Sequence, residues 1–92
     1  MLKFSGMEEF QTWCRQALVQ WYNASNEKKH LSFADTFVVW SCKTLQNYKC
    51  LISTTVAGDG IYVEYTYNGD RGEVYEDVYK KKSNRAITSL YE

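Results

Sequence analysis

Side chains that could support covalent or metal chemistry are few and widely spaced in this 92-residue chain. Cys14, Cys42 and Cys50 form no CxxC pair, and His30 is the single histidine. Zinc and redox sites need ligands at short spacing, and acid–base catalysis needs an acid, a base and a nucleophile that converge. We therefore expect no enzyme, no metal site and no cofactor, and we expect reduced cysteines, with a cross-strand Cys42–Cys50 contact as the alternative.

Aromatic and basic residues are the more informative candidates, because aromatics make up 16% of the chain and eight of them are tyrosines. A tyrosine can stack on a base or anchor a protein interface, and nearby lysines can contact phosphates. The candidate residues for binding a ligand or partner are Ser41, Lys43, Lys49, Ser53, Tyr62 and Arg71. Arg71 follows Asn68-Gly69-Asp70 near a predicted helix start, where a phosphate could be held. The alternatives are a core role for Tyr65 and Tyr67, with their hydroxyls at its margin, and a solvated turn position for Arg71.

The composition is that of one small globular domain spanning residues 1–92, because 45% of residues are hydrophobic and 24% are charged. Eleven basic and eleven acidic residues cancel, which argues against a nonspecific DNA coat and against an acidic DNA mimic. The longest apolar run, residues 37–40, is too short to span a bilayer, and no signal-peptide pattern opens the chain. We therefore expect a cytoplasmic protein.

An amphipathic helix is predicted near the N-terminus. Ser5 and Glu8 have the spacing of a capping box, in which each side chain bonds a free backbone N–H. The apolar residues that follow recur at helical spacing and form one stripe: Phe10, Trp13, Cys14, Ala17, Leu18 and Trp21. The polar stretch 23–29 should end this helix.

Three strands are predicted next, over residues 36–45, 48–56 and 61–67. Alternation places Val38, Trp40 and Cys42 toward the core and Ser41 and Lys43 outward. A three-residue turn at 46–48 keeps the two faces separate by pairing Cys42 with Ile52 and Thr44 with Cys50.

The second hairpin is predicted to turn at residues 57–60, where Gly58 and Gly60 supply positive φ angles. This turn pairs Val56 with Ile61, Thr54 with Val63, and Ile52 with Tyr65. The outward face is then mostly polar, and an open face is expected there: Ser41, Lys43, Lys49, Leu51, Ser53, Thr55, Tyr62, Glu64 and Thr66.

After Asn68-Gly69 two structures fit the sequence. Asp70 and Glu73 have capping-box spacing, and the apolar residues of 74–79 recur at helical intervals. Asn-Gly is also a strong hairpin signal, and 75–79 would then be a fourth strand. We favour the helix, which gives an α+β fold of order α-β-β-β-α, with a three-stranded antiparallel sheet and the helices on one face; the alternative is a fourth strand in place of the second helix.

The run Val38-Val39-Trp40-Ser41-Cys42-Lys43-Thr44-Leu45-Gln46-Asn47, with residues 51–55 and Tyr65-Thr66-Tyr67-Asn68-Gly69-Asp70, resembles a family of uncharacterised small phage and prophage proteins of Gram-positive bacteria. The resemblance covers residues 36–82 and implies an accessory protein in the cytoplasm of the bacterial host cell. It brings no catalytic residues. The predicted order also resembles the double-stranded-RNA-binding domain in topology, although Asp70-Arg71-Gly72-Glu73 stands where such domains carry a lysine cluster.

These observations lead to two hypotheses. The first is a non-enzymatic phage accessory protein, for counter-defence or host takeover, that sequesters a nucleotide signal or blocks a host protein. The second is a nucleic-acid-binding accessory protein in phage replication or transcription, resting on the aromatic third strand and the lysines at 80–82. Because a small sheet leaves exposed edges, we also expect a homo-oligomer. No membrane partner is expected.

Overall fold

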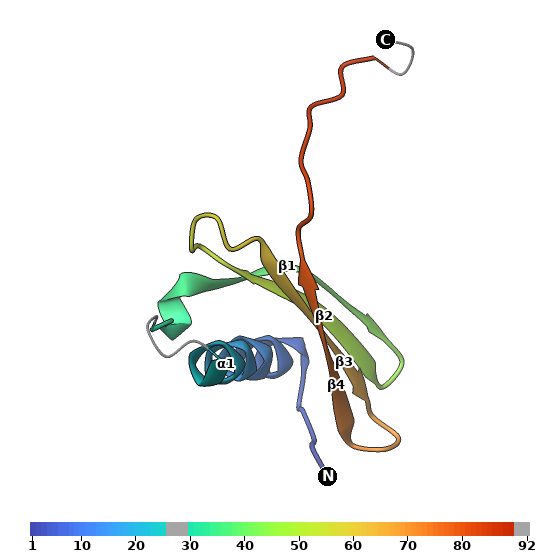
Figure 1. Cartoon of the computed structure of the whole chain (residues 1–92). Coiled ribbons are helices and arrows are strands. Elements are labelled where there is room, and N and C mark those ends of the chain that lie inside the picture. Colours follow the sequence, from blue (N-terminus) through green and yellow to red (C-terminus); the bar gives the residue numbers. More distant parts are fainter. Residues whose placement is uncertain (26–29, 90–92) are drawn as a thin grey trace.

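The computed structural model describes residues 1–25 and 30–89 and has one α-helix and one four-stranded antiparallel sheet (Figure 1). The helix α1 spans Met7–Ser25, and a short 3-10 turn, η1, spans Phe33–Asp35. The strands are β1 (Thr36–Thr44), β2 (Asn47–Thr54), β3 (Ile61–Asn68) and β4 (Glu73–Lys80). They lie side by side in chain order, so the sheet is a meander of three hairpins. The predicted three-stranded sheet is wrong by one strand, and the fold remains α+β.

In place of the capping box predicted from Ser5 and Glu8, a different contact forms at the start of α1. Glu9, not Glu8, accepts hydrogen bonds from the backbone N–H of Ser5, at 3.1 Å, and from its hydroxyl. The buried stripe then runs at intervals of four: Phe10, Cys14, Leu18 and Tyr22. Of the other predicted stripe residues, Trp13, Ala17 and Trp21 lie half-buried beside it. The helix ends at Ser25, and the rest of the polar stretch, 26–29, lies outside the described residues.

The first hairpin departs from the predicted register in two ways. Thr44 pairs directly with Asn47, so the turn has two residues, and Leu45 adopts a positive φ of 56° there. A β-bulge lies between Val38 and Trp40, where the register shifts by one residue. A bulge gives one strand an extra residue, so every side chain beyond it changes face. The predicted pairs of Cys42 and Thr44 are therefore wrong.

The second hairpin is displaced by two residues from the prediction, because Ile52 pairs with Val63 and Cys50 with Tyr65. A displacement by two leaves each side chain on its predicted face. The predicted loop of residues 57–60 is accordingly longer, and β3 begins at Ile61 as expected.

The second predicted helix is wrong, and its residues form β4, the alternative that the sequence left open. The connecting turn is organised by Asn68, whose side-chain oxygen accepts hydrogen bonds from the backbone N–H groups of Asp70 and Arg71. Gly72 completes the turn with a φ of 64°, which favours glycine. Without a second helix, the topological resemblance to the double-stranded-RNA-binding domain is lost.

The core lies on one side of the sheet, between α1 and the strands β1 to β3. Its centre consists of residues with no exposed surface, including Phe10, Cys14, Cys50 and Ile52. Aromatic rings close its end near the N-terminus, where Phe4 lies edge-on to Tyr67 with centroids 4.9 Å apart. The hydrogen bond from the Tyr67 hydroxyl to the Leu2 carbonyl, at 3.0 Å, ties the N-terminal segment to this end.

Arg15 fastens α1 to the beginning of β1. Its guanidinium donates to the Thr36 hydroxyl at 2.8 Å and to the Phe33 and Thr36 carbonyls at 3.0 Å, and it lies 3.8 Å from the centre of the Phe33 ring. These contacts fix which side of the sheet the helix covers and leave the other side bare.

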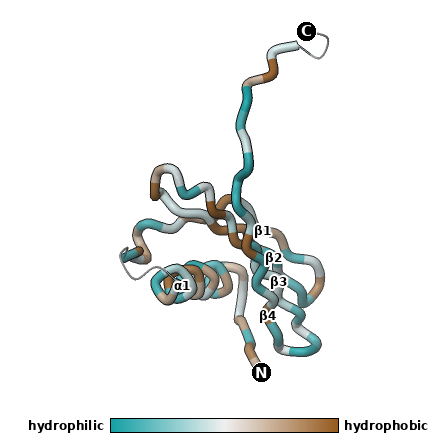
Figure 2. The backbone as a smooth tube through the Cα atoms, in the orientation of Figure 1, coloured by the Kyte–Doolittle hydropathy of each residue, from teal (hydrophilic) through white to brown (hydrophobic). Residues whose placement is uncertain are grey.

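Residues 81–89 leave the end of β4 as an extended tail that points away from the sheet (Figure 1). The tail is exposed along its described length, and most of it is hydrophilic (Figure 2).

Candidate binding surface

The sheet has one side facing α1 and one side that no described element covers, which we call the open face. Strand pairing places the following residues together on it: Phe37, Trp40, Cys42, Lys49, Leu51, Ser53, Tyr62, Glu64, Thr66, Tyr75, Asp77 and Tyr79. The residues that alternate with these along each strand lie on the side facing α1. Ser41, for example, accepts a hydrogen bond from Gln11 of α1 at 2.8 Å. The open face thus includes residues from all four strands.

Aromatic side chains at the two outer strands dominate the open face. Phe37 and Trp40 of β1 are 43% and 41% exposed, and Tyr75 and Tyr79 of β4 are 49% and 53% exposed. Tyr62 of β3 lies opposite Tyr79 in the register with β4. Exposed rings gathered on a bare surface are characteristic of interaction sites rather than of ordinary solvated faces.

The electrostatics of the open face are acidic. Lys49 lies 3.3 Å from the carboxylate of Glu64 in an ion pair at the middle of the face. Glu64 lies opposite Asp77, and Glu73 lies on the same side near the turn. Lys49 is therefore surrounded by more negative charge than it can neutralise, which opposes the approach of a phosphate.

The predicted site residues do not all meet. Lys49, Ser53 and Tyr62 lie on the open face as expected. Ser53 is buried, and its hydroxyl donates to the Ile61 carbonyl at 2.7 Å, so it lines the face without offering a free donor.

Ser41 and Lys43 lie on the other side, because the bulge at Val39 reverses the alternation of the second half of β1. The Lys43 ammonium lies 5.3 Å from the centre of the Tyr48 ring there. The same reversal moves Trp40 and Cys42 from their predicted inward positions to the open face. It also separates Cys42 from Cys50, which now lie on opposite sides of the sheet as free thiols.

Arg71 lies in the β3–β4 turn and not at a helix start, since β4 replaces the predicted helix. Its guanidinium is 4.0 Å from the Glu73 carboxylate, and both side chains are largely exposed. Asp70, expected as a helix cap, instead accepts a hydrogen bond from Gln46 at 2.7 Å, which links the two turns at this end of the sheet.

The aromatic residues of β1 and β4 are the part of the surface that the sequence reasoning missed. In β4 every second residue is acidic or aromatic, in the order Glu73, Tyr75, Asp77 and Tyr79. This spacing of two is typical of one exposed face of a strand and could have identified the two tyrosines. The alternation predicted for the first strand already places Phe37 outward, next to the inward Val38. For Trp40 no local signal was available, because its outward position depends on the bulge between Val38 and Trp40.

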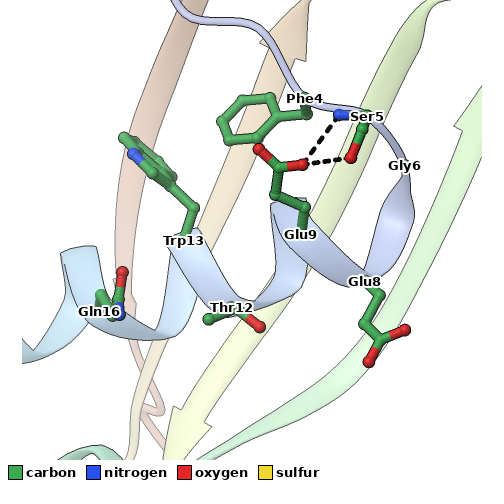
Figure 3. A pocket seen from close by; sticks show the side chains of 8 residues that line it. All are labelled: Phe4, Ser5, Gly6, Glu8, Glu9, Thr12, Trp13 and Gln16. Atoms are coloured by element: carbon green, nitrogen blue, oxygen red, sulfur yellow. Dashed lines mark hydrogen bonds between the residues drawn. The ribbon is translucent and has the colours of Figure 1, made fainter.

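Two hollows complete the surface. A small one of about 180 Å³ lies beside Cys42, Lys49 and Thr66 on the open face. The other, about 740 Å³, is a broad depression at the start of α1, where Phe4 lies beside the carboxylate of Glu9 and the Glu8 side chain points away from both Phe4 and Trp13 (Figure 3). The hydrogen bonds from the Ser5 hydroxyl and backbone N–H lower the pKa of Glu9 in this depression.

The described residues contain no group of three or more histidine, cysteine, aspartate or glutamate side chains that could hold a metal ion. Within residues 1–25 and 30–89, no helix has both the length and the apolarity needed to cross a membrane.

Comparison with known proteins gives a family. No curated protein and no solved structure matches the chain significantly. The model of a family of unknown function, DUF6275, matches residues 11–89, which include most of α1, all four strands and the tail. The chain therefore belongs to the DUF6275 family.

Proposed function

We propose that this chain is a non-enzymatic binding protein that blocks a partner protein by docking on it through the open face. The observation that carries the proposal is the set of exposed rings on both outer strands, Phe37, Trp40, Tyr75 and Tyr79, on a side of the sheet that no described element covers. Interface energy concentrates in a few large aromatic anchors, and such residues are costly to leave in water unless a partner covers them.

The biological setting of the proposal is a phage-encoded accessory protein that serves counter-defence or host takeover. It rests on the resemblance of residues 36–82 to small phage and prophage proteins. Such a protein can act by occupying a surface of a host protein, for which a rigid sheet with an aromatic face is well suited.

A protein partner is favoured over a nucleotide signal because of the charges. Lys43 and Lys49, which would have met phosphates together, lie on opposite sides of the sheet, and Lys49 is paired with Glu64. Arg71 lies beside Glu73. Phosphate binding draws on several converging cations, and the open face instead gathers carboxylates.

The experiment compares capture of host proteins by three forms of the full chain. The double variant Phe37→Ser with Trp40→Ser removes the β1 anchors, and Leu45→Ser, which alters an 80% exposed leucine in the β1–β2 turn, is the matched control. Truncating interface anchors typically costs at least about 2 kcal/mol, or roughly 30-fold in affinity. We expect a host protein that the wild type and Leu45→Ser retain and the double variant loses, with the thermal midpoint confirming that each form is folded.

Retention of every captured protein by the double variant would refute docking through the open face. A rise of the thermal midpoint with cyclic di- or trinucleotides would replace the proposal with nucleotide sequestration. Micromolar binding to RNA or single-stranded DNA at physiological salt, weakening steeply as salt rises, would replace it with the nucleic-acid hypothesis.

A further inference from the structure

β4 is an edge strand whose outer side is free. Apart from its ladder with β3, it makes no backbone hydrogen bond to any other segment in the described part of the chain. Its side chains are also poorly covered on the helix side, where Val78 is 44% exposed, because α1 packs over β1 and β2. A free edge of eight residues with exposed apolar side chains is a template for pairing with another strand.

The tail extends this edge beyond the body of the protein. The backbone N–H of Lys81 donates to the Gly60 carbonyl at 2.7 Å, so the pairing with β3 continues one residue past the end of β4. Beyond Lys81 the chain stays extended and runs on in the direction of β4 (Figure 1). The family match reaches residue 89, so the tail is part of the unit that the family shares.

The edge and the tail carry opposite charges. β4 contains three acidic residues, Glu73, Glu76 and Asp77, all exposed. The tail contributes three cations, Lys81, Lys82 and Arg85, and no acidic residue up to residue 89. The net charge of the chain is zero, yet β4 and the tail that follows it carry complementary charges along one extended segment.

We propose that a second copy of this chain pairs with β4, so that the acidic edge of each copy lies against the basic tail of the other. The pairing is antiparallel about a two-fold axis at Tyr79, and residues whose numbers add up to 158 lie opposite each other. This register places all three acids opposite cations: Glu73 with Arg85, Glu76 with Lys82, and Asp77 with Lys81.

The choice of register follows from the geometry of a sheet. Opposite residues of paired strands share a face, and a two-fold axis perpendicular to the sheet keeps both helices on one side, so the two numbers must have an even sum. A sum of 154 sets Asp77 against its own copy, and a sum of 160 sets Lys80 against its own copy. A sum of 156 pairs one of the three acids, Glu76, with a cation. Only a sum of 158 places all three acidic residues opposite cations. It also places Tyr79 of one copy opposite Tyr79 of the other.

The dimer would be an eight-stranded sheet, with both open faces on its same side. Tyr79 would then lie at the centre of a surface to which both copies contribute. This inference does not depend on the proposed function, because strand pairing uses the backbone edge of β4, although the side chains of Glu73, Asp77 and Tyr79 also belong to the open face.

The test uses charge reversal in two complementary variants. The first, Glu73→Lys with Asp77→Lys, makes β4 basic; the second, Lys81→Glu with Arg85→Glu, makes the tail acidic. The altered side chains are all exposed, and Glu76, which accepts a hydrogen bond from the Tyr65 hydroxyl, stays unchanged. Light scattering and sedimentation should give twice 10.8 kDa for the wild type and 10.8 kDa for each variant alone. An equimolar mixture of the two variants should regain the two-chain mass, because each strand then faces opposite charge again.

The control is Lys3→Glu with Glu8→Lys, which reverses two exposed charges at the N-terminus and should leave the dimer intact. A wild type with the mass of one chain at high micromolar concentration would overturn the proposal. So would a dimer that survives both charge-reversed variants, or variants that remain single chains when mixed. Capture of host proteins by a single-chain wild type would leave the proposed function standing, so the two proposals can fail separately.

Discussion

Cysteine reactivity gives a direct measurement of the register that creates the open face. Cys42 is exposed there, whereas Cys14 and Cys50 have no exposed surface and lie in the core between α1 and the sheet. Simple alternation along the first strand would instead point Cys42 inward. The structure therefore predicts one fast-reacting thiol among three.

The difference in rate should be large. A buried thiol reacts when the protein opens, and a chain of this length typically has a free energy of unfolding of about 5–14 kcal/mol. At 1.4 kcal/mol for each factor of ten, even about 5 kcal/mol slows the reaction by roughly 10³-fold or more if global unfolding is required. Burial also raises the pKa of the Cys14 thiol, which reduces its reactive thiolate form.

The assay follows the release of a chromogenic thiolate from an aromatic disulfide reagent. Native protein should react with one equivalent quickly, and denatured protein with three. Cys42→Ser should abolish the fast phase, while Cys14→Ser, which leaves the open face unaltered, should retain it. Two or more fast equivalents in native protein, or a fast phase that survives in Cys42→Ser, would refute the bulge-dependent register.

Two further predictions concern contacts that hold the helix and the first strand. Arg15→Lys keeps the charge but loses the planar donor geometry that reaches Thr36 and Phe33, so the free energy of unfolding should fall by about 1–2 kcal/mol in urea titrations; an unchanged midpoint would contradict this role. Asp35 accepts two hydrogen bonds from Ser32, at 2.9 Å, which lower its pKa below the ordinary 3.8. This stabilisation is complete above the unfolded-state pKa and is lost as pH falls through the lower folded-state pKa. Urea titrations from pH 6 to pH 2 should therefore show the stability difference between wild type and Asp35→Asn shrinking at the acid end, and a difference independent of pH would contradict it.

Local patterns determined much of this protein. The apolar spacing of residues 10–21 is sufficient to place α1, because helix formation depends on contacts within four residues. The β-branched and aromatic composition of residues 36–67 is likewise sufficient to indicate strands, and the displacement of the second hairpin by two residues left Lys49, Ser53 and Tyr62 on their predicted face.

The tertiary structure decided the rest, because the remaining choices depend on partners distant in the sequence. Val74, Tyr75, Val78 and Tyr79 fit a helical spacing and also populate both faces of a strand, and pairing with the free edge of β3 selects the strand. The bulge at Val39 reverses the faces of the rest of β1, which brings Trp40 and Cys42 to the open face and takes Ser41 and Lys43 to the helix side. The position of the bulge is fixed by the contacts that each side of the sheet then makes. On the covered side Gln11 of α1 donates a hydrogen bond to Ser41, and on the open face the rings of Phe37 and Trp40 stay exposed.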